Sequence, residues 1–239
     1  MHLSVVIPVY NEGANFHALW AELSQYLTCD YTAFIVYDHD EDDTLGVINE
    51  IIAAGEKRLS PVKNLRGKGV SAAIMTGFDV APSGPVLIVM GDLSDDLRQV
   101  DRMLELYRQG YHLVAGSRYM KGGSMVGGPV FKQALSRLAG TSLYWLRGLP
   151  THDATNAFKI YDRSMVQTFN VESRNGFELN LELTVKAFLG GYRIAEVPSM
   201  WRDRTKGESR FRLWKWLPHY LHWYFYAFRG KTQTALKQE

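Results

Sequence analysis

The sequence has a single cysteine and no long apolar run, and both absences exclude classes of protein. Cys29 cannot form a disulfide within the chain, and no cysteine and histidine cluster has the spacing of a structural zinc site. No stretch reaches the roughly 18 apolar residues that a membrane-spanning helix requires. The N-terminus lacks the basic region of a signal peptide and meets Pro8 and Asn11 after a short apolar run. We therefore expect a chain that resides in a reducing compartment and has no spanning segment.

The sequence also lacks an excess of charge of either sign. It has 27 lysines and arginines against 25 aspartates and glutamates, which gives a formal net charge of +2. No nucleic-acid partner is expected, because the chain as a whole offers no electrostatic support for one. Its 239 residues, 46% of them hydrophobic, are enough to bury a sizeable core in one large α/β domain.

Strand-like and helix-like segments alternate along the chain. Apolar, β-branched runs predict strands at 3–9, 33–37, 61–65, 85–90 and 112–118. Apolar residues at steps of three and four predict helices at 14–27, around 47–52, at 69–80 and at 96–108. This alternation indicates a mostly parallel sheet with helices on both faces. Ligands of such sheets bind beyond the carboxyl ends of the strands. That edge is expected to gather residues 10–12, 38–43, 92–96 and 117–118.

The first polar cluster lies in the stretch AFIVYDHDEDDT, residues 33–44. Five carboxylates fall between Asp38 and Asp43. Three interpretations stay open: a solvated turn in which Asp42 or Asp43 caps the next helix, a metal site, or a site whose polar groups bind a ribose or base. Like charges at short range raise one another's pKa or require a cation. One or two of these acids, at the end of the strand, are expected to be functional.

The second polar cluster follows the apolar stretch PVLIVM. Asp92 is the first charged residue after it and is expected at the carboxyl edge of the sheet. A cap for the helix at 96–108 is the alternative role, but Ser94 or Asp95 could fill that role equally well. Mg²⁺ typically uses one or two protein carboxylates while substrate phosphates complete its shell. We therefore predict a functional Asp92 in a site for a nucleotide diphosphate.

A glycine pair separates the two acidic clusters. Gly67 and Gly69 flank Lys68 immediately before the predicted helix at 69–80. The segment could cradle an anion at the helix start, or it could make a tight turn into a packed helix. Both interpretations remain open at this stage.

Seven blocks of the sequence together resemble one protein family. They are VVIPVYNE at 5–12, IVYDHDEDDT at 35–44, NLRGKGVSAAIMTGF at 64–78, MGDLSDD at 90–96, GSRY at 116–119, DATNAFKIY at 153–161 and RDRTKGESRF at 202–211. In this order they resemble glycosyltransferase family 2, and within it the branch similar to dolichyl-phosphate mannose synthase. The resemblance implies the GT-A fold, an α/β architecture with a Rossmann-like nucleotide-binding half. It also implies a nucleotide-diphosphate sugar donor, Mg²⁺ or Mn²⁺ as cofactor and a polyprenyl phosphate acceptor.

The resemblance assigns donor-binding roles to residues in the first four blocks. The donor-binding residues it implies are Pro8, Tyr10, Glu12, Val36, Asp38 and Asp92, together with Arg210 from the last block. Asp42 and Thr44 match the residues that close the turn and start the helix. Asp92 is the implied metal ligand, whereas Met90 replaces the first acid of the family's Asp-x-Asp pair and Tyr37 replaces the first acid of the base-binding pair. Two outcomes stay open: a weaker metal site, or a contribution from Asp95 or Asp96.

The resemblance also assigns residues to the acceptor phosphate. These residues are Arg118, Lys132, Arg204 and Ser209, of which Arg118 and Arg204 join Asp92 as implied catalytic residues. Their cationic side chains would offset the repulsion between an anionic donor and a dianionic acceptor. Asp153 and Thr155 are implied to position a sugar hydroxyl or their own loop. A phosphate acceptor is already ionised near neutral pH, so a general base adds little.

The last segment bears on membrane association. Residues 211–230 mix aromatic and basic side chains, which is typical of a helix that lies in the headgroup layer. The alternative is a helix docked on the catalytic domain, and the two roles can coexist. The predicted organisation is a GT-A catalytic domain at 1–210, this helix at 211–230 and a polar tail at 231–239. We expect a peripheral location on the cytoplasmic face of a membrane, with nucleotide sugar, lipid-linked phosphate and membrane surface as partners.

The sequence thus predicts an inverting glycosyltransferase that moves a hexose to a polyprenyl phosphate. GDP-mannose and a UDP-sugar both remain open as donors. Two other functions also remain open. One is transfer to a saccharide or protein hydroxyl, which would require a base such as Asp153. The other is nucleotide-sugar binding without catalysis, which Met90 and Tyr37 at usually acidic positions suggest.

Overall fold

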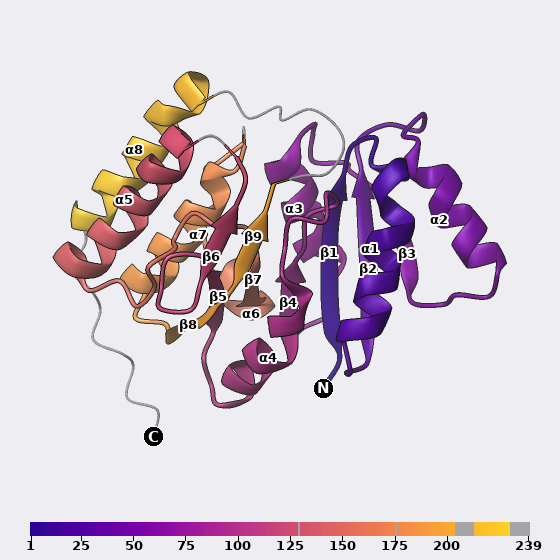
Figure 1. Cartoon of the computed structure of the whole chain (residues 1–239), viewed down its shortest axis with the longest axis horizontal. Helices are drawn as coiled ribbons and strands as arrows, with labels where there is room; N and C mark the ends of the chain where they lie inside the picture. Colours follow the sequence, from indigo (N-terminus) through magenta and orange to yellow (C-terminus); the bar gives the residue numbers. More distant parts are fainter. Residues whose placement is uncertain (129, 175, 204–212, 230–239) are drawn as a thin grey trace.

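The computed structural model describes residues 1–128, 130–174, 176–203 and 213–229 (Figure 1). The strands in this part of the chain are β1 (Leu3–Val9), β2 (Tyr31–Tyr37), β3 (Leu59–Lys63), β4 (Pro85–Ile88), β5 (Leu113–Ser117), β6 (Ser124–Val126), β7 (Lys159–Asp162), β8 (Ile194–Pro198) and β9 (Met200–Arg202). The helices are α1 (Gly13–Tyr26), α2 (Thr44–Ala53), α3 (Val70–Val80), the 3-10 helix η1 (Leu97–Gln99), α4 (Val100–Arg108), α5 (Val130–Arg147), α6 (Arg163–Gln167), α7 (Glu178–Leu189) and α8 (Leu213–Arg229).

Seven of these strands form one sheet in the order β3-β2-β1-β4-β7-β5-β8, while β6 pairs with β9 (Figure 1). Strands β1 to β4 run parallel to one another, and β5 runs parallel to β8. The predicted mostly parallel sheet is therefore confirmed. The exception is β7, which lies between β4 and β5 and runs antiparallel to both. Because its direction is reversed, β7 begins at the edge where β4 and β5 end.

Helices cover both faces of the sheet, and β1 shows why. Its residues are all buried, and alternate side chains enter different cores because successive residues of a strand point to opposite faces. Val6 belongs to the core that contains residues of α3 and α7. Val5 and Ile7 belong to the core that contains residues of α1, α2 and α4. A strand buried on both sides needs the continuous apolar run that the sequence shows.

The elements around residues 85–108 differ from the predicted bounds in one respect. β4 ends at Ile88, and the helix predicted over 96–108 begins as η1 and continues as α4. The cause is a tight turn over residues 91–96, in which the Asp95 side chain accepts a hydrogen bond from the Met90 amide at 2.8 Å. Leu93 has a φ of 63° in this turn. The turn therefore includes Asp96, which the hydrophobic pattern assigns to the helix.

Helix α8 packs on the helices that cover the sheet. It lies along α5 and α7, and its Trp223 and Ala227 are buried (Figure 1). The Trp223 indole Nε1 donates to Ser173 Oγ at 3.1 Å, and the Tyr224 hydroxyl lies 3.0 Å from Ser142 Oγ on α5. The docked arrangement predicted as one alternative is thus present. Among the described helices, none combines the length and apolar character needed to cross a bilayer.

Candidate functional site

The turn after β2 uses its carboxylates to join neighbouring loops. Asp38 follows β2 directly, and its Oδ1 accepts a hydrogen bond from Asn64 Nδ2 at 2.8 Å. Its Oδ2 accepts from the Gly69 amide, also at 2.8 Å. Asn64 follows β3, so Asp38 links the ends of two parallel strands to the start of α3. Each carboxylate oxygen retains capacity for another donor. Gly69 has a φ of 98°, and its amide is engaged by Asp38, which favours the tight-turn interpretation of this glycine segment.

Asp42 joins the turn after β2 to the turn after β1. Its two carboxylate oxygens each lie 3.1 Å from the Asn11 amide, and Oδ1 also accepts from the amide and hydroxyl of Thr44. Thr44 Oγ1 in turn accepts from the Glu12 amide at 3.0 Å. Asp43 is exposed, yet its Oδ1 accepts from the Gly13 amide at 2.9 Å. The Asp42 and Thr44 contacts agree with their predicted role of closing this turn.

The other predicted donor residues surround the same end of β1. Tyr10 is 42% exposed, and its ring meets that of His39 edge-on with centroids 5.1 Å apart. Glu12 is half-buried and accepts from Asn15 Nδ2 at 2.8 Å. Pro8 and Val36 are register partners in β1 and β2, and both are buried. Tyr10 thus offers an exposed aromatic surface at the sheet edge, while Val36 belongs to the core beneath it.

The second acidic turn, residues 92–96, keeps its carboxylates buried. Asp92, Asp95 and Asp96 are each at most 9% exposed. Asp92 Oδ1 accepts from the Ser94 amide at 3.2 Å, and Asp96 pairs with Arg98 at 2.6 Å. None of these three side chains makes a capping hydrogen bond at the start of η1 or α4. The helix-cap interpretation of this cluster is therefore not supported, and its burial has another cause.

Burial raises the pKa of the Asp95 carboxyl to about 7, and the charges of Asp92 and Asp96 act in the same direction. The Met90 amide and the charge of Arg118 oppose the increase. Asp95 thus lies in the field of two other carboxylates of its own turn, and like charges at short range favour either protonation or a nearby cation. Within the described residues, no three acidic, histidine or cysteine side chains form a complete metal shell. A hard divalent ion at this turn would take one or two carboxylates and complete its shell with ligand phosphates.

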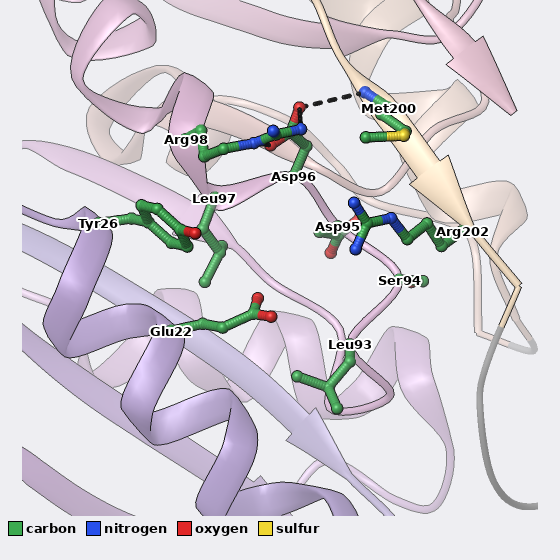
Figure 2. Close-up of a pocket in the computed structure, with 10 residues that line it drawn as sticks. All are labelled: Glu22, Tyr26, Leu93, Ser94, Asp95, Asp96, Leu97, Arg98, Met200 and Arg202. Carbon is green, nitrogen blue, oxygen red and sulfur yellow. Dashed lines mark hydrogen bonds and ion pairs between the residues drawn. The ribbon is translucent and has the colours of Figure 1, made fainter. Parts of the chain in front are cut away.

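A small pocket lies beside this acidic turn, on the side of α1 (Figure 2). Its volume is about 80 Å³, and Figure 2 shows Glu22 and Arg202 extending toward it next to Asp95. The Arg202 amide donates to the Ser94 carbonyl at 3.1 Å, and the Met200 amide donates to Asp96 at 3.4 Å. The pocket is too small for a nucleotide, since ligand pockets measure about 300 Å³ or more. Its walls instead show that β9 is fixed to the acidic turn.

A buried ion pair lies at the end of β5. Arg118 donates to Asp153 from Nε at 2.6 Å and from Nη2 at 2.8 Å, and its backbone amide donates to the same carboxylate at 3.1 Å. The Arg118 side chain is 10% exposed and that of Asp153 is fully buried. Two predicted site residues, far apart in sequence, are thus joined by a bidentate contact. Such contacts fix the plane of the guanidinium.

The charges of this pair are mutually stabilised. Burial by itself would raise the pKa of Asp153, but the charge of Arg118, its hydrogen bonds and the charge of Lys159 outweigh burial and lower that pKa. Burial would lower the pKa of Arg118, and Asp153 raises it above its usual value. Asp153 is therefore ionised with both oxygens bound to Arg118. A carboxylate in this state is a poor general base.

Helix α5 contacts the same pair. Ser136 Oγ lies 3.3 Å from Arg118 Nη2 and 2.8 Å from Thr155 Oγ1. Thr155 Oγ1 also accepts from Arg118 Nη2 at 3.2 Å, and its predicted role in positioning a sugar hydroxyl or its loop stays a prediction. Lys132 lies in the first turn of α5. Arg204, Ser209 and Arg210 lie outside the described residues.

The sequence alone did not indicate three residues that support the site: Asn64, Ser136 and Lys159. Asn64 is buried and binds Asp38, while Ser136 binds Arg118. Lys159 is fully buried in β7, directly beneath the Asp153 loop. In the sequence, such residues could be recognised only as polar side chains at positions where the hydrophobic pattern of a strand or helix predicts an apolar one. That signal is weak for a single serine or asparagine, and stronger for a lysine inside the strand sequence FKIY.

Comparison with known proteins identifies a family. A sequence model described as Glycosyl transferase family 2 matches residues 4–169. Polyprenol monophosphomannose synthase from Mycolicibacterium smegmatis is 28% identical over 212 residues, which cover 86% of this chain and 79% of the relative. Dolichol-phosphate mannosyltransferase from Pyrococcus furiosus is 28% identical over 219 residues, which cover 89% of this chain and 60% of the relative. The chain therefore spans less than two thirds of the second relative.

Solved structures share the architecture. One is the crystal structure of glucosyl-3-phosphoglycerate synthase from Mycobacterium tuberculosis in complex with Mn²⁺, UDP and glucosyl-3-phosphoglycerate. It matches with a TM-score of 0.65 at 16% identity, covering 95% of this chain and 79% of that one. At this identity the likeness concerns the fold alone. The predicted fold class, a GT-A type α/β sheet with helices on both faces, is confirmed.

Proposed function

Because the chain belongs to glycosyltransferase family 2, we propose that it transfers a hexose from a nucleotide-diphosphate sugar to a polyprenyl phosphate. The names of the two relatives, a polyprenol monophosphomannose synthase and a dolichol-phosphate mannosyltransferase, support a lipid-linked acceptor. The base and the sugar of the donor stay open between GDP-mannose and a UDP-sugar. The catalytic part is assigned to residues 1–210, with the helix at 211–230 as an appended docking element.

One observation carries the proposed acceptor class. Both carboxylate oxygens of Asp153 are bound to Arg118, and the pair is buried at the sheet edge next to the acidic turn. A hydroxyl acceptor has to lose a proton during transfer and needs a base, whereas a phosphate acceptor arrives ionised. Asp153 is ionised but occupied, so its role is to hold Arg118. Because Asp153 takes the edge formed by Nε and Nη2, a phosphate would meet the other edge of the planar guanidinium, whose orientation Asp153 fixes.

The mechanism depends on positioning and charge. Arg118, with Lys132, Arg204 and Ser209 as further acceptor-side residues, orients the acceptor phosphate for in-line attack on the anomeric carbon with inversion. Tyr10, Glu12 and Asp38 hold the nucleoside at the ends of β1 and β2, and Arg210 is assigned to the donor pyrophosphate. Asp92 would hold Mg²⁺ or Mn²⁺, which when bound neutralises charge on the departing nucleoside diphosphate. Thr155 and Ser136 keep Arg118 in its orientation.

We further propose that α5 and α8 lie on an anionic lipid surface. Both helices expose large apolar side chains: Phe131, Leu138, Trp145 and Leu146 on α5, and Leu221, Phe225 and Phe228 on α8. The two helices lie side by side (Figure 1). Neither sequence contains an aspartate or glutamate, although together they carry five lysines or arginines. Apolar area combined with positive charge favours binding to anionic lipid. This location would bring the site to its lipid-linked acceptor.

The transfer reaction can be tested directly. The protein is incubated with Mn²⁺, undecaprenyl phosphate or dolichyl phosphate in detergent, and radiolabelled GDP-mannose, UDP-glucose or UDP-GlcNAc in turn. Label that enters the organic phase with one donor supports the proposal. Replacing Arg118 by Lys is expected to reduce transfer strongly, because the bidentate contact is lost. Lysine in place of Arg66, an exposed partner of Asp79, serves as the matched control. Absence of transfer from all three donors, with none of them bound, would refute the proposal.

The Asp153→Asn variant separates the two acceptor classes. With a phosphate acceptor this change should impair transfer partially, because the amide still accepts one hydrogen bond from Arg118. With a hydroxyl acceptor it should abolish transfer, since the base would be absent. Donor binding in calorimetry without hydrolysis or transfer would instead indicate a nucleotide-sugar-binding protein.

Membrane docking has its own test. Vesicles of phosphatidylglycerol and phosphatidylcholine are sedimented with the wild type and with the double variant Leu138→Glu, Trp145→Glu. We expect the double variant to remain in the supernatant. Val80→Glu is the matched control, because Val80 is also exposed, at 43%, but lies on α3. Equal sedimentation of all three proteins would exclude this surface as the docking site.

A further inference from the structure

Lys159 occupies the point where three strands meet beneath the site. It is the first residue of β7, and its register partners are Ile88 at the end of β4 and Ala115 on β5. The acidic turn follows β4, and Arg118 follows β5. A lysine with no exposed surface is rare because burial of its charge is costly unless that charge is compensated. The position therefore requires an explanation in terms of what the ammonium group contacts.

The ammonium group closes the loop that carries Asp153. Lys159 Nζ donates to the Ala154 carbonyl at 3.0 Å and to the Asn156 carbonyl. Asn156 in turn donates from Nδ2 to the Gly116 carbonyl at 2.7 Å, and from its amide to Asp153 Oδ1 at 3.2 Å. The loop 153–157 is thus tied to β5 on one side and to β7 on the other. If the ammonium group were removed, the carbonyls of Ala154 and Asn156 would each lose a hydrogen-bond donor.

The charge of Lys159 also acts on the ion pair above it. Burial lowers the pKa of Lys159 to about 7; the charge of Asp153 opposes this decrease, and the charge of Arg118 adds to it. Asp153 lies between the two cations, and both lower its pKa. An oxyanion bound at Arg118 would favour the protonated form of Lys159. The lysine therefore supports Asp153 through geometry and through charge.

We infer that Lys159 is a positioning residue for the transfer reaction: by holding loop 153–157 it fixes Asp153 against Arg118 and so sets the direction in which the guanidinium meets the acceptor phosphate. This inference rests on the proposed function for its phosphate ligand. The alternative is a structural lysine that stabilises the fold without affecting Arg118. The two differ in what happens to the Arg118 side chain when Lys159 is replaced.

The first experiment needs no substrate. The Arg118 Nε–Hε signal is assigned by nitrogen-15 NMR with the help of Arg118→Lys and is then followed in Lys159→Met. Methionine keeps the unbranched shape but removes the charge and the donors. We expect the signal to shift and to exchange with solvent at least tenfold faster, because the bidentate contact loosens. Lys186→Met is the matched control, since Lys186 is a largely buried lysine on α7 that pairs with Glu182 and Glu172. An unchanged Arg118 signal in Lys159→Met would overturn the inference.

The second experiment measures the reaction. We expect Lys159→Met to lower kcat/KM for undecaprenyl phosphate by about tenfold to a hundredfold, and to leave the calorimetric Kd of the donor nucleotide within about twofold. Adding Lys159→Met to Asp153→Asn should cause little further loss, because both changes act on one contact. Losses that multiply, or a decrease no larger than that of Lys186→Met, would contradict a positioning role. If Lys159→Met does not fold, Lys159→Gln is measured by the same criteria.

The two experiments separate the inference from the proposed function. If the NMR signal responds to Lys159→Met but no donor and acceptor pair supports transfer, Lys159 still positions Arg118 and only the proposed reaction fails. If transfer occurs and the NMR signal does not respond, the proposed reaction stands and the role of Lys159 is refuted.

Discussion

The turn at residues 38–44 and the turn at residues 92–96 both follow buried parallel strands, and both carry several aspartates at one edge of the sheet. In the first turn, the carboxylates of Asp38 and Asp42 accept hydrogen bonds from backbone amides and neutral side chains of neighbouring loops. In the second turn, Asp92 and Asp95 are buried close together, and the pKa of Asp95 rises to about 7. The difference teaches that a dense acidic sequence can be a structural joint, whereas a sparser one whose carboxylates are buried near one another is the better candidate for a cation site.

The largest effect is expected from Asp92→Asn. If the second turn holds the cation, this change should lower kcat/KM for hexose transfer by about a hundredfold or more. The thermal unfolding midpoint should change little, because asparagine can still accept the hydrogen bond from the Ser94 amide. Steady-state transfer assays and differential scanning calorimetry check both parts. Activity within a few-fold of the wild type at saturating Mn²⁺ would contradict the assignment.

Asp42→Ala tests the structural role of the first turn. The change removes acceptors for the Asn11 amide and for the amide and hydroxyl of Thr44. We expect a loss of about 2 to 3 kcal/mol in the free energy of unfolding, equal to a decrease in Tm of about 5 to 10 °C. Activity per folded molecule should fall far less than in Asp92→Asn. An unchanged Tm would show that these bonds are replaced by water.

The pH dependence of stability should report the burial of Asp95 in the second turn. Its folded-state pKa is raised from 3.8 to about 7. At pH values between 3.8 and about 7, the folded state therefore binds more protons than the unfolded state. Stability from this group is fully present below pH 4 and is lost as the pH rises through 7.

Calorimetry in a chelating buffer from pH 4 to pH 8 tests this expectation for Asp95. The wild type should lose stability over that range by more than Asp95→Asn, which removes the titrating group. Identical pH profiles of the two proteins would mean that Asp95 is not protonated in the folded state.

The smallest effect is expected from Asp40→Asn in the first turn. Asp40 is 65% exposed and pairs with Lys63, which is 45% exposed. Surface pairs of this kind contribute about 0 to 1 kcal/mol. The Tm and kcat/KM should both match the wild type within measurement error. A clear loss of donor affinity would instead place Asp40 in the nucleoside site and extend the functional part of this turn.

Much of the fold could be predicted from local patterns. The strands at 3–9 and 112–118 and the helices at 14–27 and 69–80 lie within two residues of the observed bounds, because their apolar periodicity is set by the geometry of each element. The antiparallel β7 was not indicated. Its four residues have no periodicity of their own, and their place between β4 and β5 depends on tertiary pairing.

A place at the edge of the sheet was predictable where a residue directly follows a strand, as for Asp38 and Arg118. The candidate site was less predictable where two residues act together. Nothing in the spacing of Arg118 and Asp153 indicates that the carboxylate binds the guanidinium with both oxygens. The positioning role of Asp153 stays a prediction. Its contact with Arg118 supports this role, because it joins the Asp153 loop to the arginine. The lysine in FKIY was a signal for Lys159, but its burial depends on the pairing of β7 with β4 and β5.

By itself, the sequence determined the order of strands and helices, the edge of the sheet where polar residues gather, and the resemblance to one enzyme family. These features are local or follow from the order of motifs along the chain. Only the tertiary structure decided which partners each carboxylate has. Those partners are amides and cations that come from distant segments, such as Gly69 for Asp38 and Arg118 for Asp153. Burial then decides the charge of each group, because the cost of an ion depends on what surrounds it and not on its neighbours in sequence.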